Sequence, residues 1–209
     1  ITDVKETKRV NDKTPNTCIS CKSSQVLVDV EKMGTEAFYK AMFKDVGAHY
    51  DKGIGCLDCH NPKTMELRVS RPGFIEAMQR RGIDVTKATR EQMRSYVCGQ
   101  CHVEYYFKGE GKYLTFPWDK GLSVDSIEAY YDEYGFKDWD HETSGAPMIK
   151  MQHPEFETWS TGIHAKSGVT CVDCHMPYER QGSVKVTNHW IKSPLRNINN
   201  ACQTCHKWS

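Results

Sequence analysis

The sequence has almost no excess of charge of either sign and no apolar run long enough to cross a membrane. Its 209 residues include 28 Lys and Arg against 27 Asp and Glu, for a formal net charge of +1. A membrane-spanning helix needs roughly 18 or more apolar residues in succession, so we expect none here. Nucleic-acid-binding proteins are marked by a strong basic excess. The charge balance therefore argues against a nucleic-acid partner.

Apolar residues are also scarce, at 38% of the chain. A chain of this length can form one sizeable domain or two small ones, but this composition is poor material for a large core. We therefore expect a cofactor that contributes apolar surface. Convincing strand alternation and an N-terminal leader are missing as well. The chain begins at Ile1 and stops just after its last motif, at Ser209, and we interpret it either as a mature chain or, by preference, as an internal portion of a longer protein.

The cysteines are the most informative residues. All 10 fall into CxxC pairs with none left over, and histidine directly follows four of the five pairs. CxxCH is the attachment sequence of c-type haem, in which the thiols bind the porphyrin and the histidine ligates the iron. The pairs are Cys18/Cys21, Cys56/Cys59, Cys98/Cys101, Cys171/Cys174 and Cys202/Cys205, and the histidines are His60, His102, His175 and His206.

Zinc ribbons and disulfides also use CxxC pairs. Neither requires a histidine next to the second cysteine, and histidine makes up only 9 of the 209 residues. Chance would rarely place it after four of five pairs, so the pattern favours haem. Because c-type haem is attached outside the cytoplasm, we expect an exported, periplasmic protein.

The remaining pair reads Cys18-Ile19-Ser20-Cys21-Lys22, with lysine in the position of the histidine. One interpretation is a degenerate site that has lost its haem. An amine ligates iron only when deprotonated, and the charge of the metal favours that state. We interpret Lys22 as the ligand of a fifth, functional haem. The predicted fold is mostly α, a single multihaem cytochrome c domain over residues 1–209 whose long loops wrap around five haems.

Several segments have the pattern of helices. Residues 35–46 are amphipathic at helical spacing, and Pro72 begins a segment that Gly82 ends. Thr89 and Gln92 form a capping-box pattern ahead of a helix that runs into the third motif. Two further helices are expected at 124–134, after Ser123, and at 154–160.

Histidines outside the motifs are candidates for second haem ligands. An electron-transfer haem takes two protein ligands, whereas a catalytic haem leaves one position open. By number alone, four of the five could be second ligands and one could lie free. They are His49, His141, His153, His164 and His189.

One CxxCK followed by four CxxCH resembles the pentahaem cytochrome c nitrite reductase family. Two segments strengthen the resemblance, CHVEYYF at 101–107 and GAPMIKMQHPE at 145–155, the second in the long interval between the third and fourth motifs. The resemblance covers nearly the whole chain. It implies the six-electron reduction of nitrite to ammonium at the haem of Lys22, fed by four bis-histidine haems.

The resemblance also implies roles for single residues. Tyr105 and His153 would contact substrate on the open side of that haem, and His164 and His189 would be second ligands of the haems at His206 and His60. Calcium would be held by Glu104, Tyr105, Lys150 and Gln152, with Tyr105 and Lys150 using backbone carbonyls, since calcium prefers oxygen ligands. His49 and His141 are expected to be structural.

Other members of the family take further parts from regions that we expect outside this chain. These are the second ligands of the haems at His102 and His175, the helices that form a homodimer, and a substrate-binding arginine upstream of CxxCK. Arg9 lies upstream here, but its context does not match. The expected electron donor is a multihaem cytochrome, either a membrane quinol dehydrogenase or a soluble carrier. The alternatives are an octahaem nitrite or tetrathionate reductase and a non-enzymatic electron carrier.

Overall fold

The computed structural model describes residues 10–207 and is mostly helical, as expected. Its α-helices are α1 (Val26–Met33), α2 (Thr35–Lys40), α3 (Phe43–Val46), α4 (Cys56–Cys59), α5 (Pro72–Arg80), α6 (Arg90–Gly99), α7 (Val124–Tyr134), α8 (Glu155–Thr161), α9 (Ile163–Lys166), α10 (Cys171–His175) and α11 (Ile198–Ala201). Short 3-10 helices are η2 (Asn16–Ile19), η3 (Gly47–His49), η4 (Val85–Lys87) and η5 (Pro194–Arg196). Within residues 10–207, no helix is long and apolar enough to span a membrane.

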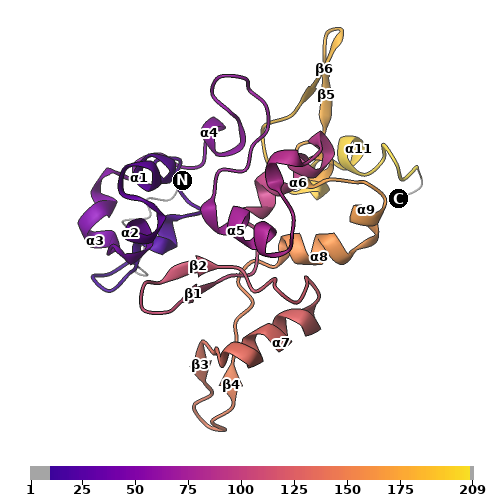
Figure 1. Cartoon of the computed structure of the whole chain (residues 1–209). Helices are drawn as coiled ribbons and strands as arrows, with labels where there is room; N and C mark the ends of the chain where they lie inside the picture. The colour runs from indigo at the N-terminus through magenta and orange to yellow at the C-terminus, as the bar shows by residue number, and fades with distance from the viewer. Residues whose placement is uncertain (1–9, 208–209) are drawn as a thin grey trace.

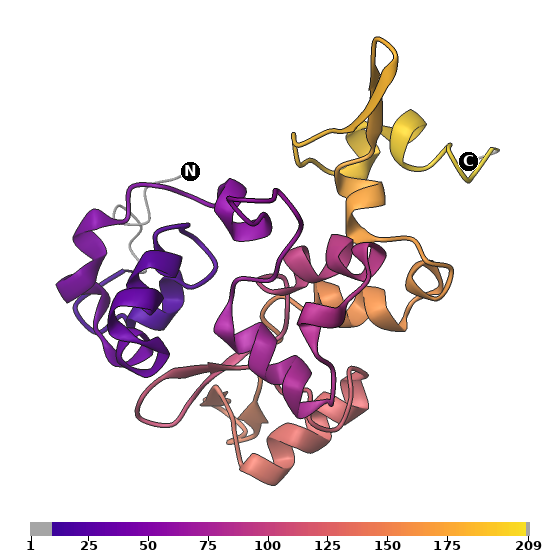
Figure 2. The ribbon, with the colours of Figure 1, turned by 45° about the horizontal axis from the view of Figure 1, so that its top comes forward.

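The elements are arranged around a central group formed by α5, α6 and α8. Helices α1 to α3 form a lobe on one side, α7 lies below the centre, and the C-terminal segment from α10 onwards extends away on the opposite side (Figures 1 and 2). Long connections join these parts. The motifs are therefore spread along the whole molecule.

Three of the expected helices are confirmed by their ends. Pro72 begins α5, and Thr89 accepts a hydrogen bond from the backbone N–H of Gln92 to start α6. Ser123 caps α7 in the same way, and Gly135 ends it in the left-handed conformation (φ 59°). These caps satisfy backbone groups that a helix end leaves unpaired. The expected helix at 154–160 is also present, as α8.

The prediction of a single helix at 35–46 is wrong. The chain turns extended at Ala41 and Met42, which separates α2 from α3. The backbone N–H of Asn16 donates to the carbonyl of Ala41, and that of Phe43 donates to the carbonyl of Thr14. Pairing with this distant segment replaces hydrogen bonds that a continuous helix would make, so tertiary contacts override the local pattern.

Strands were not expected, yet the described residues contain three antiparallel hairpins. They pair β1 (Tyr106–Lys108) with β2 (Tyr113–Thr115), β3 (Trp139–Asp140) with β4 (Pro147–Met148), and β5 (Tyr178–Gln181) with β6 (Val184–Thr187). Each strand has two to four residues. Such strands are too short for an alternation pattern, which needs about four to eight residues.

The core is built mainly from aromatic rings where α5, α6 and α8 meet. Phe74 on α5 is fully buried and makes edge-to-face contacts with Phe116, Trp118 and Phe156. Such contacts stabilise aromatic pairs beyond the area that they bury. This cluster fixes α8 against α6, and it thereby sets the position of the segment that precedes α8 and carries His153.

Candidate active site

Short helices present most of the cysteine motifs. The second and fourth motifs form α4 and α10, the first overlaps η2, and the third spans the end of α6. All ten cysteines lie in the described part of the chain, and none of them forms a disulfide. The thiols therefore remain available for thioether bonds.

The cysteines of the five motifs differ in how far they are exposed. Cys205 is exposed, as is Cys56, whereas the other eight cysteines are partly buried. The thiol of Cys205 lies 3.9 Å from the hydroxyl of its neighbour Thr204. Haem attachment at these cysteines stays a prediction that depends on the CxxC patterns.

Neighbouring motifs lie in contact. The thiol of Cys21 is within hydrogen-bonding reach of Cys101, and the thiol of Cys98 is within reach of Cys171. The first motif thus touches the third, and the third touches the fourth. Groups attached to these motifs would lie close together.

Two pairs of histidines have the spacing of ligands on opposite sides of one iron. A bond from a metal to an imidazole nitrogen is about 2 Å, so two rings that share an iron have centroids roughly 6 Å apart. The centroids of His60 and His189 are 6.2 Å apart, and those of His164 and His206 are also 6.2 Å apart. Both distances fit a metal between the rings.

Three histidine rings are oriented by a contact between their Nδ1 atom and a backbone carbonyl. Nδ1 of His60 lies 2.7 Å from the carbonyl oxygen of Met65, and Nδ1 of His189 lies 3.0 Å from that of Thr187. Nδ1 of His175 makes a longer contact, 3.2 Å, with the carbonyl of Lys192. Metal-ligating histidines typically donate the N–H that faces away from the metal to such a carbonyl, which leaves Nε2 for the iron.

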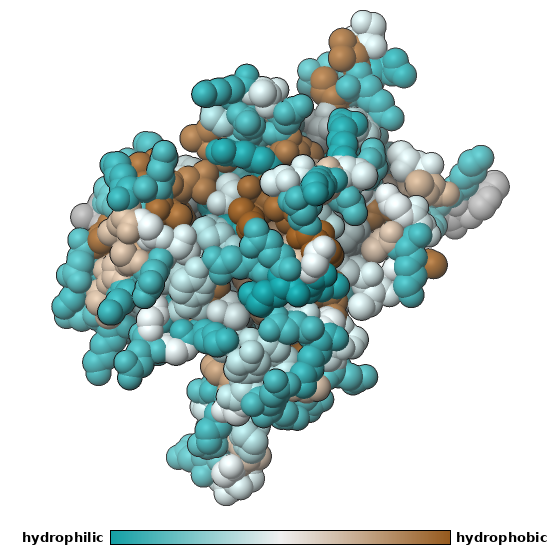
Figure 3. All heavy atoms as spheres, in the orientation of Figure 1, coloured by the Kyte–Doolittle hydropathy of each residue, from teal (hydrophilic) through white to brown (hydrophobic). Residues whose placement is uncertain are grey.

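Apolar side chains are exposed beside the motifs. Ile54 and Leu57 are exposed at the second motif, and Leu195 and Ile198 are exposed just before the fifth. Trp190, next to His189, is 78% exposed. Figure 3 shows apolar atoms gathered in the hollows between the N-terminal lobe and α6. Exposed apolar patches of this kind mark binding sites for apolar ligands or partners, and they fit a haem.

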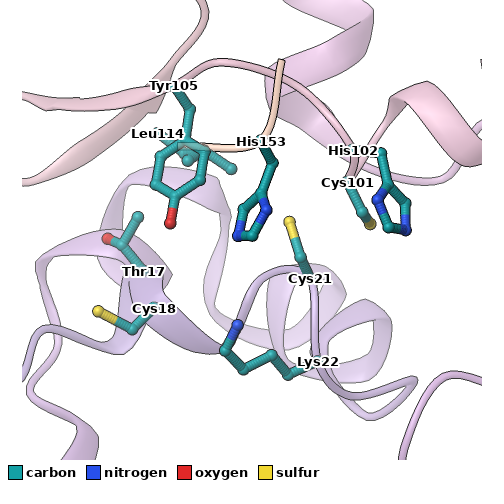
Figure 4. A pocket seen from close by; sticks show the side chains of 9 residues that line it. All are labelled: Thr17, Cys18, Cys21, Lys22, Cys101, His102, Tyr105, Leu114 and His153. Atoms are coloured by element: carbon teal, nitrogen blue, oxygen red, sulfur yellow. The ribbon is translucent and has the colours of Figure 1, made fainter. Parts of the chain in front are cut away.

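Lys22, Tyr105 and His153 line one cavity of about 210 Å³. Figure 4 shows the amine, the phenol oxygen and the imidazole directed into the same space, between Cys18 and Cys21. The rings of Tyr105 and His153 lie 23° from parallel with centroids 6.5 Å apart. This volume is below the range typical of sites for drug-sized ligands, about 300–1,000 Å³. Its remaining lining residues are Thr17, Cys101, His102 and Leu114.

The two aromatic side chains of this cavity differ in their surroundings. Burial raises the pKa of Tyr105 to about 12, so its phenol keeps its proton at neutral pH. The side chain of His153 is 54% exposed, and its Nδ1 lies 4.0 Å from a carboxylate oxygen of Glu155. The other oxygen of Glu155 is 3.7 Å from Nδ1 of His102. Tyr105 is thus a fixed hydrogen-bond donor, and His153 has access to water.

Glu104 is a buried carboxylate beside the cavity. Its side chain accepts hydrogen bonds from the phenol of Tyr131, at 2.8 Å, and from the backbone N–H of Gln152. Burial raises its pKa to about 7, and these hydrogen bonds oppose the shift. No ion pair joins it to Lys or Arg within residues 10–207.

A second buried carboxylate supports the segment that carries Glu104. Oε1 of Glu157 accepts the backbone N–H of Glu104 at 3.0 Å and the indole N–H of Trp118 at 2.6 Å. Its Oε2 is buried without a hydrogen-bond partner among the described residues. Two uncompensated buried carboxylates fit a nearby cation, because a buried charge is stable only when it is paired or bound to a metal.

The four expected calcium ligands come from two segments that the structure brings together, since Gln152 bonds directly to Glu104. The backbone N–H of Lys150 donates to Asp138 at 2.7 Å. Among residues 10–207, no three His, Cys, Asp or Glu side chains group as metal ligands. The expected set differs from such groups because it has one carboxylate and otherwise amide and backbone oxygens.

The other histidines lie away from the cavity. His49 contacts Asp29 at 2.8 Å, and His141 contacts the hydroxyl of Ser144 at 3.0 Å. Sequence reasoning missed Tyr131 and Glu157, which hold Glu104, and no motif marks them. Arg9 lies outside the described residues.

Paired thiols followed by a ligand, the two histidine pairs and the exposed apolar surroundings define this chain as a multihaem c-type cytochrome. The model of the cytochrome c552 family matches residues 1–209. The chain therefore belongs to the cytochrome c552 family.

Curated relatives named cytochrome c-552 agree with this assignment. The relative from Parabacteroides distasonis is 55% identical over 195 residues, and that from Desulfotalea psychrophila is 45% identical over 208 residues. These alignments cover 93% and 94% of this chain but 40% and 41% of the relatives. The chain thus spans about two fifths of their length.

A solved structure has the same fold. It is a cytochrome c nitrite reductase from Desulfovibrio desulfuricans, a catalytic subunit with two calcium sites. The TM-score is 0.84 at 39% identity, over 93% of this chain and 44% of that one.

The spacing of the histidine pairs leads to a spectroscopic prediction. We expect His189→Ala to take away the second ligand of the haem at His60, so that one low-spin ferric signal is lost and a high-spin signal is gained. Electron paramagnetic resonance of the oxidised full-length protein measures both. Haem content by mass should stay unchanged, because Cys56 and Cys59 remain. His141→Ala is the control and should leave the spectrum intact; an unaltered spectrum in His189→Ala would remove His189 as a ligand.

Proposed function

We propose that the full-length protein that contains this chain reduces nitrite to ammonium in a six-electron reaction at the cavity of Lys22. The observation that carries this proposal is the convergence of Lys22, Tyr105 and His153 beside the one CxxC pair that no histidine follows. Three segments far apart in the sequence contribute these side chains. The nitrite reductase from Desulfovibrio desulfuricans, which the chain resembles, supports the same conclusion.

The residues present would hold the cofactor and leave room for a substrate. A haem bound to Cys18 and Cys21 supplies an iron with an open position and passes electrons to the substrate there. The neutral amine of Lys22 would ligate that iron from one side. Tyr105 and His153 would then face the other side, where the cavity has space for a small anion.

Tyr105 and His153 would have different roles toward the substrate, the first as a hydrogen-bond donor and the second as a proton donor. The phenol of Tyr105 stays protonated and donates a hydrogen bond to an anion, which fixes its orientation. An imidazole is the side chain best suited to deliver protons near neutral pH. Because His153 is half exposed, it can regain protons from water between successive transfers.

Calcium would complete the electrostatics of this site. Glu104 and Gln152 would bind it through side-chain oxygens, and Tyr105 and Lys150 through backbone carbonyls. A divalent cation beside the cavity would offset the buried charge of Glu104 and attract an anionic substrate. Since Tyr105 is itself a ligand, the cation would also hold that side chain in place.

The other four motifs would carry haems for electron supply, and His189 and His164 would be second ligands of the haems at His60 and His206. That gives five covalently bound haems within residues 1–209, the last of them on Cys202 and the exposed Cys205. The electron donor would be a multihaem cytochrome, either a membrane quinol dehydrogenase or a soluble carrier. Export to the periplasm and homodimer formation, through segments beyond this chain, complete the proposal.

Lys22→His tests the role of the lysine. The variant reads CxxCH and should retain its haem, but kcat for nitrite should fall at least about tenfold, which corresponds to roughly 1.4 kcal/mol in the barrier. Ammonium production with a reduced artificial donor measures turnover, and mass spectrometry measures haem content. Lys87→His, at an exposed site on η4, is the control. Unchanged turnover with full haem content would show that the lysine has no special role.

His153→Asn tests proton delivery. We expect kcat to fall roughly 100-fold, the lower end of what general acid catalysis contributes, with haem spectra unchanged because no iron loses a ligand. The matched control is His141→Asn. Loss of a low-spin haem signal in His153→Asn would instead identify His153 as an iron ligand, and the proposed role would be wrong.

Glu104→Gln tests the calcium site. Loss of a coordinating carboxylate should weaken calcium binding at least about tenfold, since even residues behind the ligands contribute 10–100-fold. Calcium is measured by titration after chelation, and added calcium should restore nitrite reduction in the wild type more readily than in the variant. Glu128→Gln, exposed on α7, should behave as the wild type. Equal calcium affinity in both variants would contradict the assignment.

A further inference from the structure

Arg71 is a charged side chain in the interior of the protein. It precedes α5, and its side chain is 1% exposed. A buried guanidinium is costly unless a carboxylate and hydrogen-bond acceptors surround it. Asp58, whose side chain is 3% exposed, lies 2.5 Å from it and supplies the opposite charge. Asp58 belongs to the second cysteine motif, and neither residue of this ion pair lines the cavity described above.

The guanidinium joins the first two motifs. Its Nε donates to the carbonyl of Ser20 at 2.6 Å, and its Nη2 donates to Asp58 at 2.5 Å and to the carbonyl of Ser23 at 3.2 Å. Ser20 lies inside the motif that ends in Lys22, and Asp58 lies inside the motif of α4. One planar group thus bonds to both, which only arginine can do with a rigid fork of donors.

The third motif meets the same residue through its amide. Oε1 of Gln100 accepts the backbone N–H of Arg71 at 3.1 Å, and its Nε2 donates to the carbonyl of Asp58 at 2.8 Å. Gln100 is 1% exposed. Ser20, Asp58 and Gln100 each directly precede the second cysteine of their motif. The same position in three motifs therefore converges on Arg71.

We propose that Arg71 is a positioning residue that fixes the loop of Lys22 against the next two motifs and, balanced by Asp58, sets the reduction potential of the haem at Lys22. This rests on haem attachment at these motifs, which is part of the proposed function, but not on nitrite as the substrate. Reduction of ferric to ferrous iron adds one negative charge. A fixed positive charge nearby favours the reduced state, and burial keeps water from screening it.

The two charges of the pair give opposite predictions. Arg71→Gln removes the positive charge and leaves Asp58, so the reduction potential of the haem at Lys22 should move downward. Asp58→Asn removes the negative charge and leaves Arg71, so the potential should move upward. A clamp that acted only through shape would be loosened by either change, and its effects would share one sign or would not appear in the potential.

The experiment is a potentiometric titration of the full-length holoprotein without substrate, followed through the high-spin ferric signal by electron paramagnetic resonance. Arg80→Gln is the matched control, because Arg80 pairs with Asp119 and with the carbonyl of Phe116, away from the motifs. Its potential should equal that of the wild type. Arg71→Lys keeps the charge and should hold the potential, while its kcat falls several-fold because the loop is less firmly held.

Opposite shifts in Arg71→Gln and Asp58→Asn, with no shift in Arg80→Gln, support the proposal. Shifts of the same sign, or none, with full haem content overturn it. If Arg71→Gln does not mature, an unmoved potential in Asp58→Asn or a moved one in Arg71→Lys overturns it equally. Because no nitrite is present, either result stands apart from whether nitrite is the substrate.

Discussion

The buried ion pair between Arg71 and Asp58 joins the parts of the chain that carry its chemistry. Three motifs, on η2, on α4 and at the end of α6, meet there, and each motif has to present thiols in a defined direction. A scarce apolar core does not supply that precision. Charge-assisted hydrogen bonds supply it instead, because they are short, directional and strong away from water. The fourth motif repeats the device, since the carboxylate of Asp173 accepts the backbone N–H of Thr170 at the start of α10 and a hydrogen bond from Arg94 at 2.5 Å.

Buried carboxylates without a cationic partner among the described residues lie elsewhere, beside the cavity of Lys22. Arg71 and Asp58 balance each other, whereas Glu104 and Glu157 are buried close together without a cation among the described residues. The first arrangement joins the motifs, and the second is the one at which we propose a calcium ion. Glu104 also helps to position the side chains of the cavity, because Tyr105 directly follows it and His153 directly follows Gln152, whose backbone N–H bonds to Glu104.

Residue type and spacing predict the attachment residues, since covalent chemistry demands two thiols and a ligand in close succession. Helix ends at α5, α6 and α7 were equally predictable, because caps are local. The break between α2 and α3 was not, since it depends on pairing with residues 14–16, far away in the sequence. The role of Arg71 could not be predicted for the same reason, because one arginine among many acquires that role only when three distant segments fold onto it. The available signal was the aspartate that directly precedes the second cysteine in two of the motifs, Asp58 and Asp173. Burial is equally non-local, and the pattern around Cys205 gave no sign that its thiol would be exposed.

The histidine pairs have a consequence for how such a protein is assembled. His60 and its partner ring, His189, are separated by most of the length of the chain, whereas His164 and His206 belong to neighbouring segments. Closing a long loop costs more entropy than closing a short one, and contacts distant in sequence form late. A haem attached at α4 would therefore wait for its second ligand until nearly the whole segment had been delivered.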